Sequence, residues 1–304
     1  MQWRKIDRKK IISDRRMMIL IGMVVLCFAY VALQKYLNIK AEKKIDHIIS
    51  GIRSYADIQY NGILVDPISR KVHINNITIT PKSSLESLSI SELILYQCDA
   101  KNRIPHTLHF AIKDFKICQD NIRLLKLGPY FNELGYSELK VDFDLEYRLD
   151  KKDESLVINK MVIGAKNAGR AEFYLKLNRF NLTRILNSSN STENLSKTLP
   201  FVLISEASLN YADDSFVSRF LERLARRGNR PAEYLIHDIS EDLQKRIGDS
   251  SEDTRIQLKA LIDFINNPDK IKITAYPENP VPLANFLWLR DLNDLIDLLR
   301  IRIN

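Results

Sequence analysis

The sequence predicts an α+β protein with an N-terminal transmembrane helix, then a curved, mainly antiparallel β-sheet with a C-terminal helical segment packed on it. Three observations predict this fold class. An uncharged apolar run follows a basic tail. The centre of the chain holds segments in which apolar residues alternate with a period of two, as in strands. From Asp213 onward the apolar spacing becomes that of helices.

The composition is that of a folded protein. The 304 residues are 45% hydrophobic and 28% charged, with a formal net charge of +8. Residues 1–16, which form the predicted cytoplasmic tail, hold seven basic and two acidic side chains, so 39 basic and 36 acidic residues remain in the rest of the chain. A nearly neutral body disfavours broad contact with phosphate backbones, and we expect no nucleic-acid partner.

Residues 17–33 are the predicted transmembrane helix. These 17 residues carry no charge, and as a helix they span roughly 25 Å, the lower limit for a bilayer. The basic tail then places the N-terminus in the cytoplasm and the bulk of the chain on the other side. A cleaved signal peptide is disfavoured because the run lacks a small-x-small cleavage site, and a buried core helix is the other alternative.

Residues 34–54 continue the helical pattern. The positions Leu37, Lys40/Ala41, Lys44/Ile45 and Ile48/Ile49 recur at helical spacing, in a helix that ends near Gly51. This segment is either a stalk that holds the body away from the membrane or the first helix packed on that body.

The β-rich body, residues 55–212, begins with three segments that share the spacing apolar-x-apolar-x-x-apolar-x-apolar. They are KVHINNITIT, LSISELIL and FAIKDFKI. A helix would divide the four positions between opposite sides, so the pattern indicates strands. The apolar positions are Val72, Ile74, Ile77, Ile79, Leu88, Ile90, Leu93, Leu95, Phe110, Ile112, Phe115 and Ile117.

Each of these strands changes phase by one residue in the middle. A β-bulge absorbs such a slip, keeps the apolar residues on one face and bends the strand. The expected bulges lie at Asn75–Asn76, Ser91–Glu92 and Lys113–Asp114, and a weaker fourth copy has its slip between Ile204 and Ala207. The alternative is that the two halves of each strand face different neighbours in an ordinary sandwich.

Uninterrupted alternation follows in the segment from Leu139 to Leu149, and short turns lead to two further strands around residues 155–165 and 171–177. This is an antiparallel meander. Residues 213–304 form the predicted helical segment, with a return strand near residues 270–276 and one or two apolar helices at the end.

The sequence shows no catalytic, cofactor-binding or metal-binding motif. His106 and His109 would face opposite ways on a strand, and no further ligand completes a metal spacing. The neighbours Asp213 and Asp214 are better explained as helix caps. We therefore expect a protein that is not an enzyme and has no cofactor, although a dispersed active site leaves no local signature.

Two further groups of residues carry expectations. Cys98 and Cys118 follow two successive strands, and in a simple hairpin they would lie at opposite ends, roughly 30 Å apart. A disulfide therefore needs another pairing, and buried free thiols are the alternative.

Five arginines share one side of the first predicted C-terminal helix and could contact anionic lipid headgroups, with a solvated helix face as the alternative. They are Arg219, Arg223, Arg226, Arg227 and Arg230.

The segment from Gly62 to Leu95, preceded by the basic tail and apolar run, resembles the N-terminal part of AsmA-like envelope proteins. In that family a strand of the form x-V-x-I-x-N-I-x-I precedes one ending in L-x-I-x-x-L-x-L. The resemblance implies anchoring in the inner membrane of a Gram-negative bacterium with the body in the periplasm. It also implies a curved sheet whose apolar groove binds phospholipid, lined here by the twelve positions of the slipped strands. This chain is shorter and has its own helical C-terminal part.

Two functions follow from these observations. The first is a membrane-anchored, non-catalytic protein that binds lipid or contributes to lipid transport and maintenance in the envelope. The alternative is a scaffold of a secretion, pilus or division complex that recruits other envelope proteins. An open apolar groove favours the first, and a closed core with an exposed sheet edge favours the second.

Overall fold

The structure is a computed structural model that describes residues 8–84, 86–99, 105–118, 133–181, 199–248, 250–289 and 291–304. In the first helix, side chains are described at residue 23 and from residue 25 onward. The helices are α1 (Arg8–Ile52), α5 (Phe216–Arg227), α6 (Ala232–Gly248), α7 (Glu252–Asn266) and α8 (Leu292–Leu299), with 3₁₀ helices η1 (Leu199–Phe201) and η2 (Leu283–Trp288).

The strands form one sheet of twelve members, all paired antiparallel. They are β1 (Ala56–Gln59), β2 (Ile63–Val65), β3 (Val72–Pro81), β4 (Leu88–Cys98), β5 (Thr107–Cys118), β6 (Glu138–Asp150), β7 (Ser155–Ala165), β8 (Gly169–Asn178), β9 (Leu203–Asp213), β10 (Lys270–Ala275), β11 (Val281–Pro282) and β12 (Ile301–Ile303).

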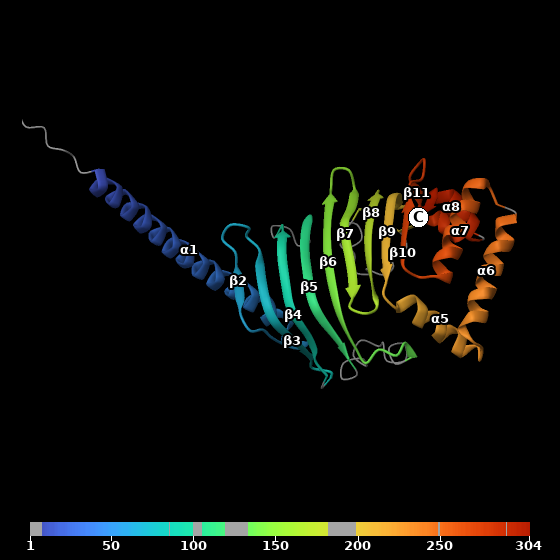
Figure 1. The fold of residues 1–304 in the computed structure, drawn as a ribbon, viewed down its shortest axis with the longest axis horizontal. Helices are drawn as coiled ribbons and strands as arrows, with labels where there is room; N and C mark the ends of the chain where they lie inside the picture. The colour runs from blue at the N-terminus through green and yellow to red at the C-terminus, as the bar shows by residue number, and fades with distance from the viewer. Residues whose placement is uncertain are drawn as a thin grey trace, which may run out of the picture.

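The strand order follows the chain closely. It runs β1-β3-β4-β5-β6-β7-β8-β9-β10-β12, with β2 beside β3 and β11 beside β9. Figure 1 shows this row, with α1 projecting from the β3 end and α5 to α8 gathered at the other end. The predicted antiparallel meander is therefore part of a longer sheet, and β10 lies where the return strand was expected.

The slip in β5 is a β-bulge, as predicted. Lys113 and Asp114 together lie opposite Asp142, between the pairs Ile112↔Phe143 and Phe115↔Val141. Asp114 has a left-handed backbone with φ of 48°, and its N–H donates to Asp142 Oδ1 at 3.0 Å. The Asp142 carboxylate of β6 therefore stabilises the bulge in β5.

The slips in β3 and β4 take a different form because they lie side by side. The register of β3 with β4 is the same before and after the unpaired positions Asn76 and Ser91. Asn76 and Ser91 are extra residues that lie opposite each other, so the pairing register of β3 and β4 does not change. The predicted fourth slip is also observed, since Ser205 of β9 is extra between the pairs of Ile204 and Glu206 with β8.

The predicted transmembrane helix at residues 17–33 is wrong in this structure. Of the helices in the described part of the chain, none is long and apolar enough to cross a membrane. The uncharged run is 17 residues long, at the short end of the lengths that cross a bilayer, for which about 20 residues is typical. It lies within the single 45-residue helix α1, which continues through the predicted tail and stalk.

The C-terminal half of α1 packs on the sheet edge. Its partly covered residues recur at helical spacing from Gln34 to Ile49. Asn38 Oδ1 accepts a hydrogen bond from Val65 N at 2.7 Å, and Tyr60 donates to Asp46 Oδ1 at 2.7 Å. This part of α1 is therefore a packing helix of the body, the second of the two roles that the sequence left open.

The end of the chain differs from the predicted one or two apolar helices, because a strand follows α8. Helix α8 ends at Arg300, whose φ of 48° turns the chain back to form β12 beside β10. The alternating residues Ile301 and Ile303 favour a strand there, because both can then join the apolar side of the sheet. Leu243, Ile247, Leu258 and Ile296 form the core between α6, α7 and α8.

Candidate functional site

The register of the sheet brings all twelve predicted groove residues to one face. In β3 and β4 the pairs are Val72↔Leu95, Ile74↔Leu93, Ile77↔Ile90 and Ile79↔Leu88. In β4 and β5 the pairs Leu95↔Phe110, Leu93↔Ile112 and Ile90↔Phe115 continue the same face. The alternative, in which the two halves of each strand face different neighbours, is therefore wrong.

This face continues across the sheet to β12, and we call it the apolar face. Each further member is paired with a member on the neighbouring strand. In β6, β7 and β8 they are Leu139, Val141, Phe143, Leu145, Tyr147, Leu156, Ile158, Met161, Ile163, Ala171, Phe173, Leu175 and Leu177. In β9, β10 and β12 they are Ile204, Ala207, Leu209, Tyr211, Ile271, Ile273, Ala275, Ile301 and Ile303.

The middle of the apolar face is only partly covered. Of the twelve predicted groove residues, Ile77, Ile90 and Ile117 are buried and the others are partly exposed. Ile163, in a central strand, is 42% exposed. Among the described residues, extensive contacts between α-helices and strands involve α1 with β1 and β2, and α7 and α8 with β12. The apolar face is thus closed at its ends and more open between them.

A hollow of about 220 Å³ lies on the apolar face between β7 and β10. Its lining is almost wholly apolar and includes Ile158, Met161, Phe173, Leu175, Ala207, Leu209, Ile273 and Ala275. For comparison, an apolar cavity of about 150 Å³ accepts a benzene ring. The groove positions predicted from the slipped strands lie in β3 to β5 and do not include these residues, although the alternation in AEFYLKLN and KIKITA was the available signal.

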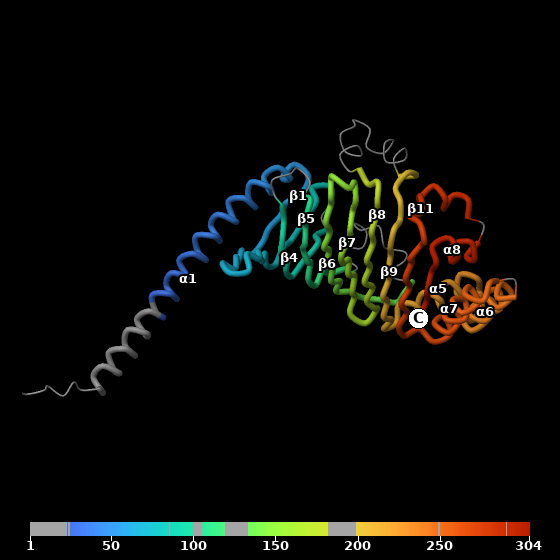
Figure 2. Tube along the Cα trace, turned by 90° about the horizontal axis from the view of Figure 1, so that it is seen from above, coloured from blue at the N-terminus to red at the C-terminus, as the bar shows by residue number. Residues whose placement is uncertain are grey.

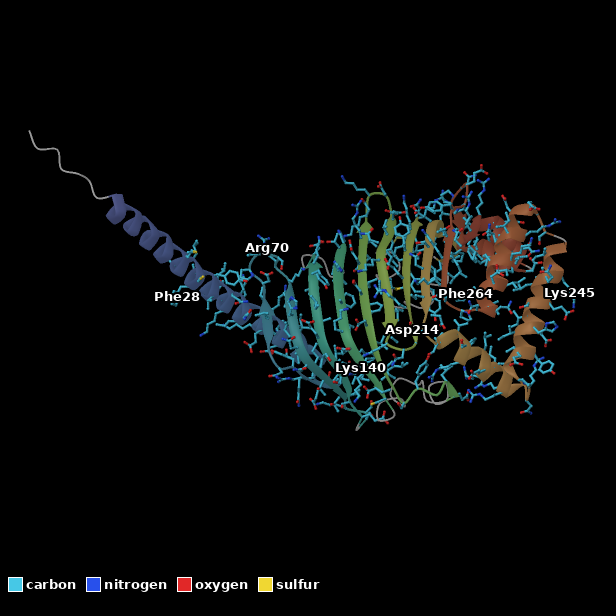
Figure 3. The ribbon with its side chains drawn as sticks, viewed as in Figure 1. Phe28, Arg70, Lys140, Asp214, Lys245 and Phe264 are labelled. Atoms are coloured by element: carbon cyan, nitrogen blue, oxygen red, sulfur yellow. The ribbon has the colours of Figure 1, made fainter. Side chains whose placement is uncertain are left out.

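Aromatic side chains close the face beside this hollow. Phe264 of α7, labelled in Figure 3, meets the ring of Tyr211 edge-on with centroids 6.2 Å apart. Burial and the hydrogen bond to Asp213 raise the pKa of Tyr211, whose hydroxyl donates to Asp213 Oδ1 at 2.5 Å. The same carboxylate accepts from Val217 N at 2.9 Å and so stabilises the first turn of α5, although the N-cap residue is Ser215 and not Asp213 or Asp214 as predicted.

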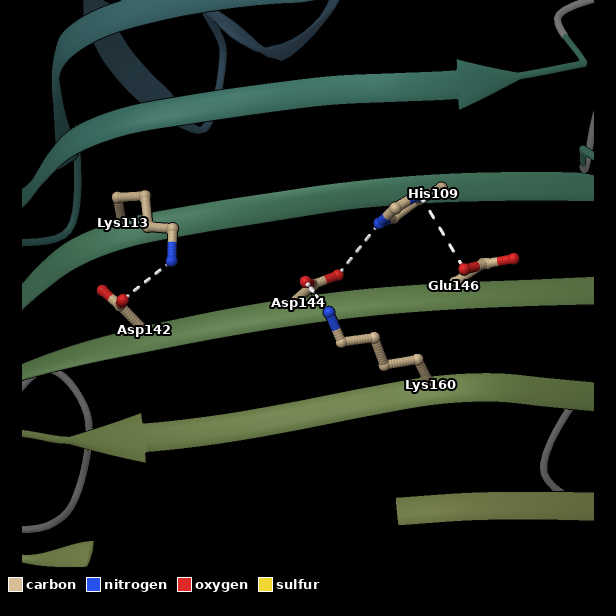
Figure 4. Close-up of polar contacts among 6 residues, drawn as sticks. All are labelled: His109, Lys113, Asp142, Asp144, Glu146 and Lys160. Carbon is tan, nitrogen blue, oxygen red and sulfur yellow. Dashed lines mark hydrogen bonds and ion pairs between the residues drawn. The ribbon is translucent and has the colours of Figure 1, made fainter. Parts of the chain in front are cut away.

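The opposite face of the sheet carries ion pairs between strands. Figure 4 shows Lys113 with Asp142 at 2.8 Å, and Asp144 with both His109 at 3.1 Å and Lys160 at 2.7 Å. Such partly exposed pairs contribute at most about 1 kcal/mol each. In the part of the chain that the structure describes, no three His, Cys, Asp or Glu side chains gather as metal ligands. These contacts stabilise the sheet.

The arginines expected to meet lipid headgroups instead hold α5 on the segment before β6. Arg223 is 5% exposed and pairs with Glu133, and Arg227 Nη2 lies 3.0 Å from the same carboxylate. Hydrogen bonds from Arg223 and Arg227 hold the pKa of Glu133 below its usual value. Arg219 donates to Gly135 O at 2.9 Å and lies over the ring of Tyr136.

The two remaining arginines also contact neighbours within the chain. Arg226 Nη2 donates to Glu133 O at 3.3 Å, and Arg230 Nη1 lies 2.5 Å from Asp238. Phe216, Phe220 and Leu224, which recur at helical spacing along α5, are exposed. The helix therefore packs through its arginine side, where the buried Arg223 meets a carboxylate and the half-buried Arg219 meets carbonyl groups.

Cys98 and Cys118 form no disulfide. Cys98 pairs with Leu108 near the start of β5, whereas Cys118 lies at the end of β5 opposite Glu138. They therefore occupy opposite ends of the β4–β5 pair, as a simple hairpin requires. Cys98 is exposed rather than buried.

Together these features define the class of protein: it is built on an open antiparallel sheet with one continuous apolar face. The opposite face carries ion pairs between neighbouring strands. Residues 162–304, which are 143 of the 304, match a family model described as "Uncharacterized protein". That match begins within β7 and includes three of the four strands that line the hollow, β8 to β10, and all the C-terminal helices, but not the slipped strands β3 to β5. A search of curated proteins found no match.

Proposed function

We propose that this protein binds acyl chains of lipid along its apolar face and is not an enzyme. The observation that carries the proposal is the partly exposed apolar face in the middle of a sheet whose ends are covered by helices. Apolar surface of this extent is costly to leave in water, and each methylene group of a bound chain contributes about 0.8 kcal/mol when buried. The hollow between β7 and β10 supplies a place where a chain or its end can be enclosed.

The proposal also names the kind of lipid that the protein binds. The resemblance of residues 62–95 to AsmA-like proteins favours phospholipid of a bacterial envelope, and a periplasmic location of the body. In that setting, binding would serve the transport or maintenance of envelope lipid. Phospholipid recovered with the protein from its native envelope would support this source.

The scaffold alternative receives less support from the sheet edges. Strand addition by a partner needs free backbone groups on an edge strand. At one edge, Val65 N donates to Asn38 of α1. At the other, Ile303 N donates to Gln257 Oε1 of α7 at 2.6 Å. Side chains of the protein itself thus cap an outward amide on each edge.

The test compares two glutamate substitutions of matched exposure on opposite faces. Ile163 is 42% exposed on the apolar face, and Leu64 of β2 is 45% exposed on the reverse, beside His73. Binding of a fluorescent fatty acid to the full chain is measured by titration. We expect Ile163→Glu to weaken binding about tenfold or more, because the new charge must be desolvated beside the acyl chain, and Leu64→Glu to bind as the unmodified protein does.

Native mass spectrometry of the purified full chain, followed by lipid extraction, provides the second readout. We expect bound lipid in the unmodified protein and in Leu64→Glu, and less in Ile163→Glu. Equal binding by the two variants, or no lipid and no probe binding in the unmodified protein, contradicts the proposal.

A further inference from the structure

An exposed apolar patch lies at the start of β9, where the 3₁₀ helices η1 and η2 lie side by side. Phe201 of η1 is 70% exposed, and Leu287 and Trp288 of η2 are 80% and 82% exposed. We call these three residues the aromatic patch. The two segments that carry it, LPFVL from residue 199 and VPLANFLWL from residue 281, contain no ionisable side chain.

The aromatic patch is built on a fixed base. Val202 and Val281, which flank it in the sequence, are buried, and Leu283 N donates to Val202 O at 2.9 Å. Strand β11, labelled in Figure 2, joins the base to β9 through the pair Val281↔Ile204. The three side chains are therefore presented outward by an ordered support.

The aromatic patch is also continuous with the hollow on the apolar face. Phe286, the residue before Leu287, packs in a cluster with Ala207 and Ala275. Both alanines line the hollow, where β9 begins and β10 ends. Buried and partly buried apolar side chains thus connect the exposed patch with the hollow.

We propose that the aromatic patch docks on a lipid surface and that acyl chains pass from there to the hollow between β7 and β10. This inference rests on the proposed acyl-chain binding. A neutral lipid surface fits because Trp, Phe and Leu partition to the boundary between headgroups and acyl chains. A protein partner would be expected to meet polar groups at the rim of such a patch, and these two segments supply no charge for it.

The first experiment uses Trp288 as its own reporter. The chain has two tryptophans, Trp3 and Trp288, so the full chain carrying Trp3→Phe fluoresces from Trp288 alone. With phosphatidylcholine vesicles we expect a blue shift of its emission, and quenching when the acyl chains are brominated. Emission unchanged by either vesicle overturns the inference. A blue shift that grows with protein concentration without vesicles assigns the patch to a second copy and also overturns it.

The second experiment measures transfer of a fluorescent phospholipid from vesicles to the protein. We expect the double variant Phe201→Ser with Leu287→Ser to slow transfer by about tenfold, because two large apolar side chains no longer enter the lipid. The matched control is Ile68→Ser, since Ile68 is equally exposed but lies in the β2–β3 turn. We expect it to transfer lipid at the unmodified rate.

Equilibrium binding of a soluble short-chain fatty acid separates the two proposals, because none of the replaced residues lines the hollow. We expect all these variants to bind it equally. If the double variant binds the fatty acid as the unmodified protein does and also transfers phospholipid at the unmodified rate, the docking inference is overturned. The proposal of acyl-chain binding is then unaffected. Absence of binding in the unmodified protein overturns both.

Discussion

At the scale of single residues, backbone conformation constrains the sequence most tightly at the turn between β7 and β8. Gly169 has φ of 153°, and a Cβ there would lie 2.7 Å from Ala212 O and 2.9 Å from the hydroxyl oxygen of Tyr211. Three N–H groups at the start of α5, from Asp214 to Phe216, donate to the carbonyl of Ala168. Gly169 thus fixes the point where the meander meets the helical segment.

We expect Gly169→Ala to lower the free energy of unfolding by about 1–3 kcal/mol, since the new side chain combines an unfavourable φ with contacts to backbone. Urea denaturation of the full chain measures this. Gly164→Ala is the matched control, because its nearest heavy atom is a side-chain carbon of Arg170 at 3.7 Å. Equal stability of the two variants would argue against strain at Gly169.

At the scale of elements, the bulge in β5 depends on a carboxylate of β6. Burial raises the pKa of Asp142, but hydrogen bonds from Lys113 and from the N–H of Asp114 outweigh it and hold the pKa below its usual value. A carboxyl with a lowered folded pKa contributes stability above its unfolded pKa of about 4, and this contribution is lost as pH falls through the folded value. The bulge should therefore be sensitive to acid.

We expect Asp142→Asn to be less stable than the unmodified protein near neutral pH, and the difference in unfolding free energy to shrink as pH falls below about 4. Urea denaturation at a series of pH values measures it. Hydrogen exchange of the Asp114 amide should also quicken in the variant, because its acceptor is weakened. A difference that is constant across the acid range would show that the carboxylate charge does not hold the bulge.

The element scale also separates what sequence patterns could and could not predict. The phase slips predicted bulges because side-chain alternation is a local property of a strand. Whether a slip shifts the register depends on the neighbouring strand, and the aligned extra residues Asn76 and Ser91 illustrate this. The packing of α5 through its arginines was not predicted either, since Glu133, the partner of Arg223, is distant in sequence. No local period reveals such a contact.

At the scale of the whole molecule, a ligand that binds only the folded sheet must stabilise it. Acyl chain at a free concentration of 100 times its dissociation constant adds about 2.7 kcal/mol to the free energy of unfolding. We therefore expect the urea midpoint of the full chain to rise with a soluble fatty acid. Ile163→Glu should gain less at the same ligand concentration, and Leu64→Glu should gain as much as the unmodified protein. A rise of equal size in all three would place the ligand away from the apolar face.

The sequence by itself determined the alternation, the phase slips and the change from strands to helices at Asp213, because each depends on residues close together in the chain. It identified twelve positions that share one face, but it assigned the apolar run near the N-terminus to a membrane span that the structure does not bear out. The tertiary structure decided the rest. Pairing between distant strands joins the short apolar rows into one face, and the packing of α1 and the C-terminal helices at its ends determines how much of that face stays open.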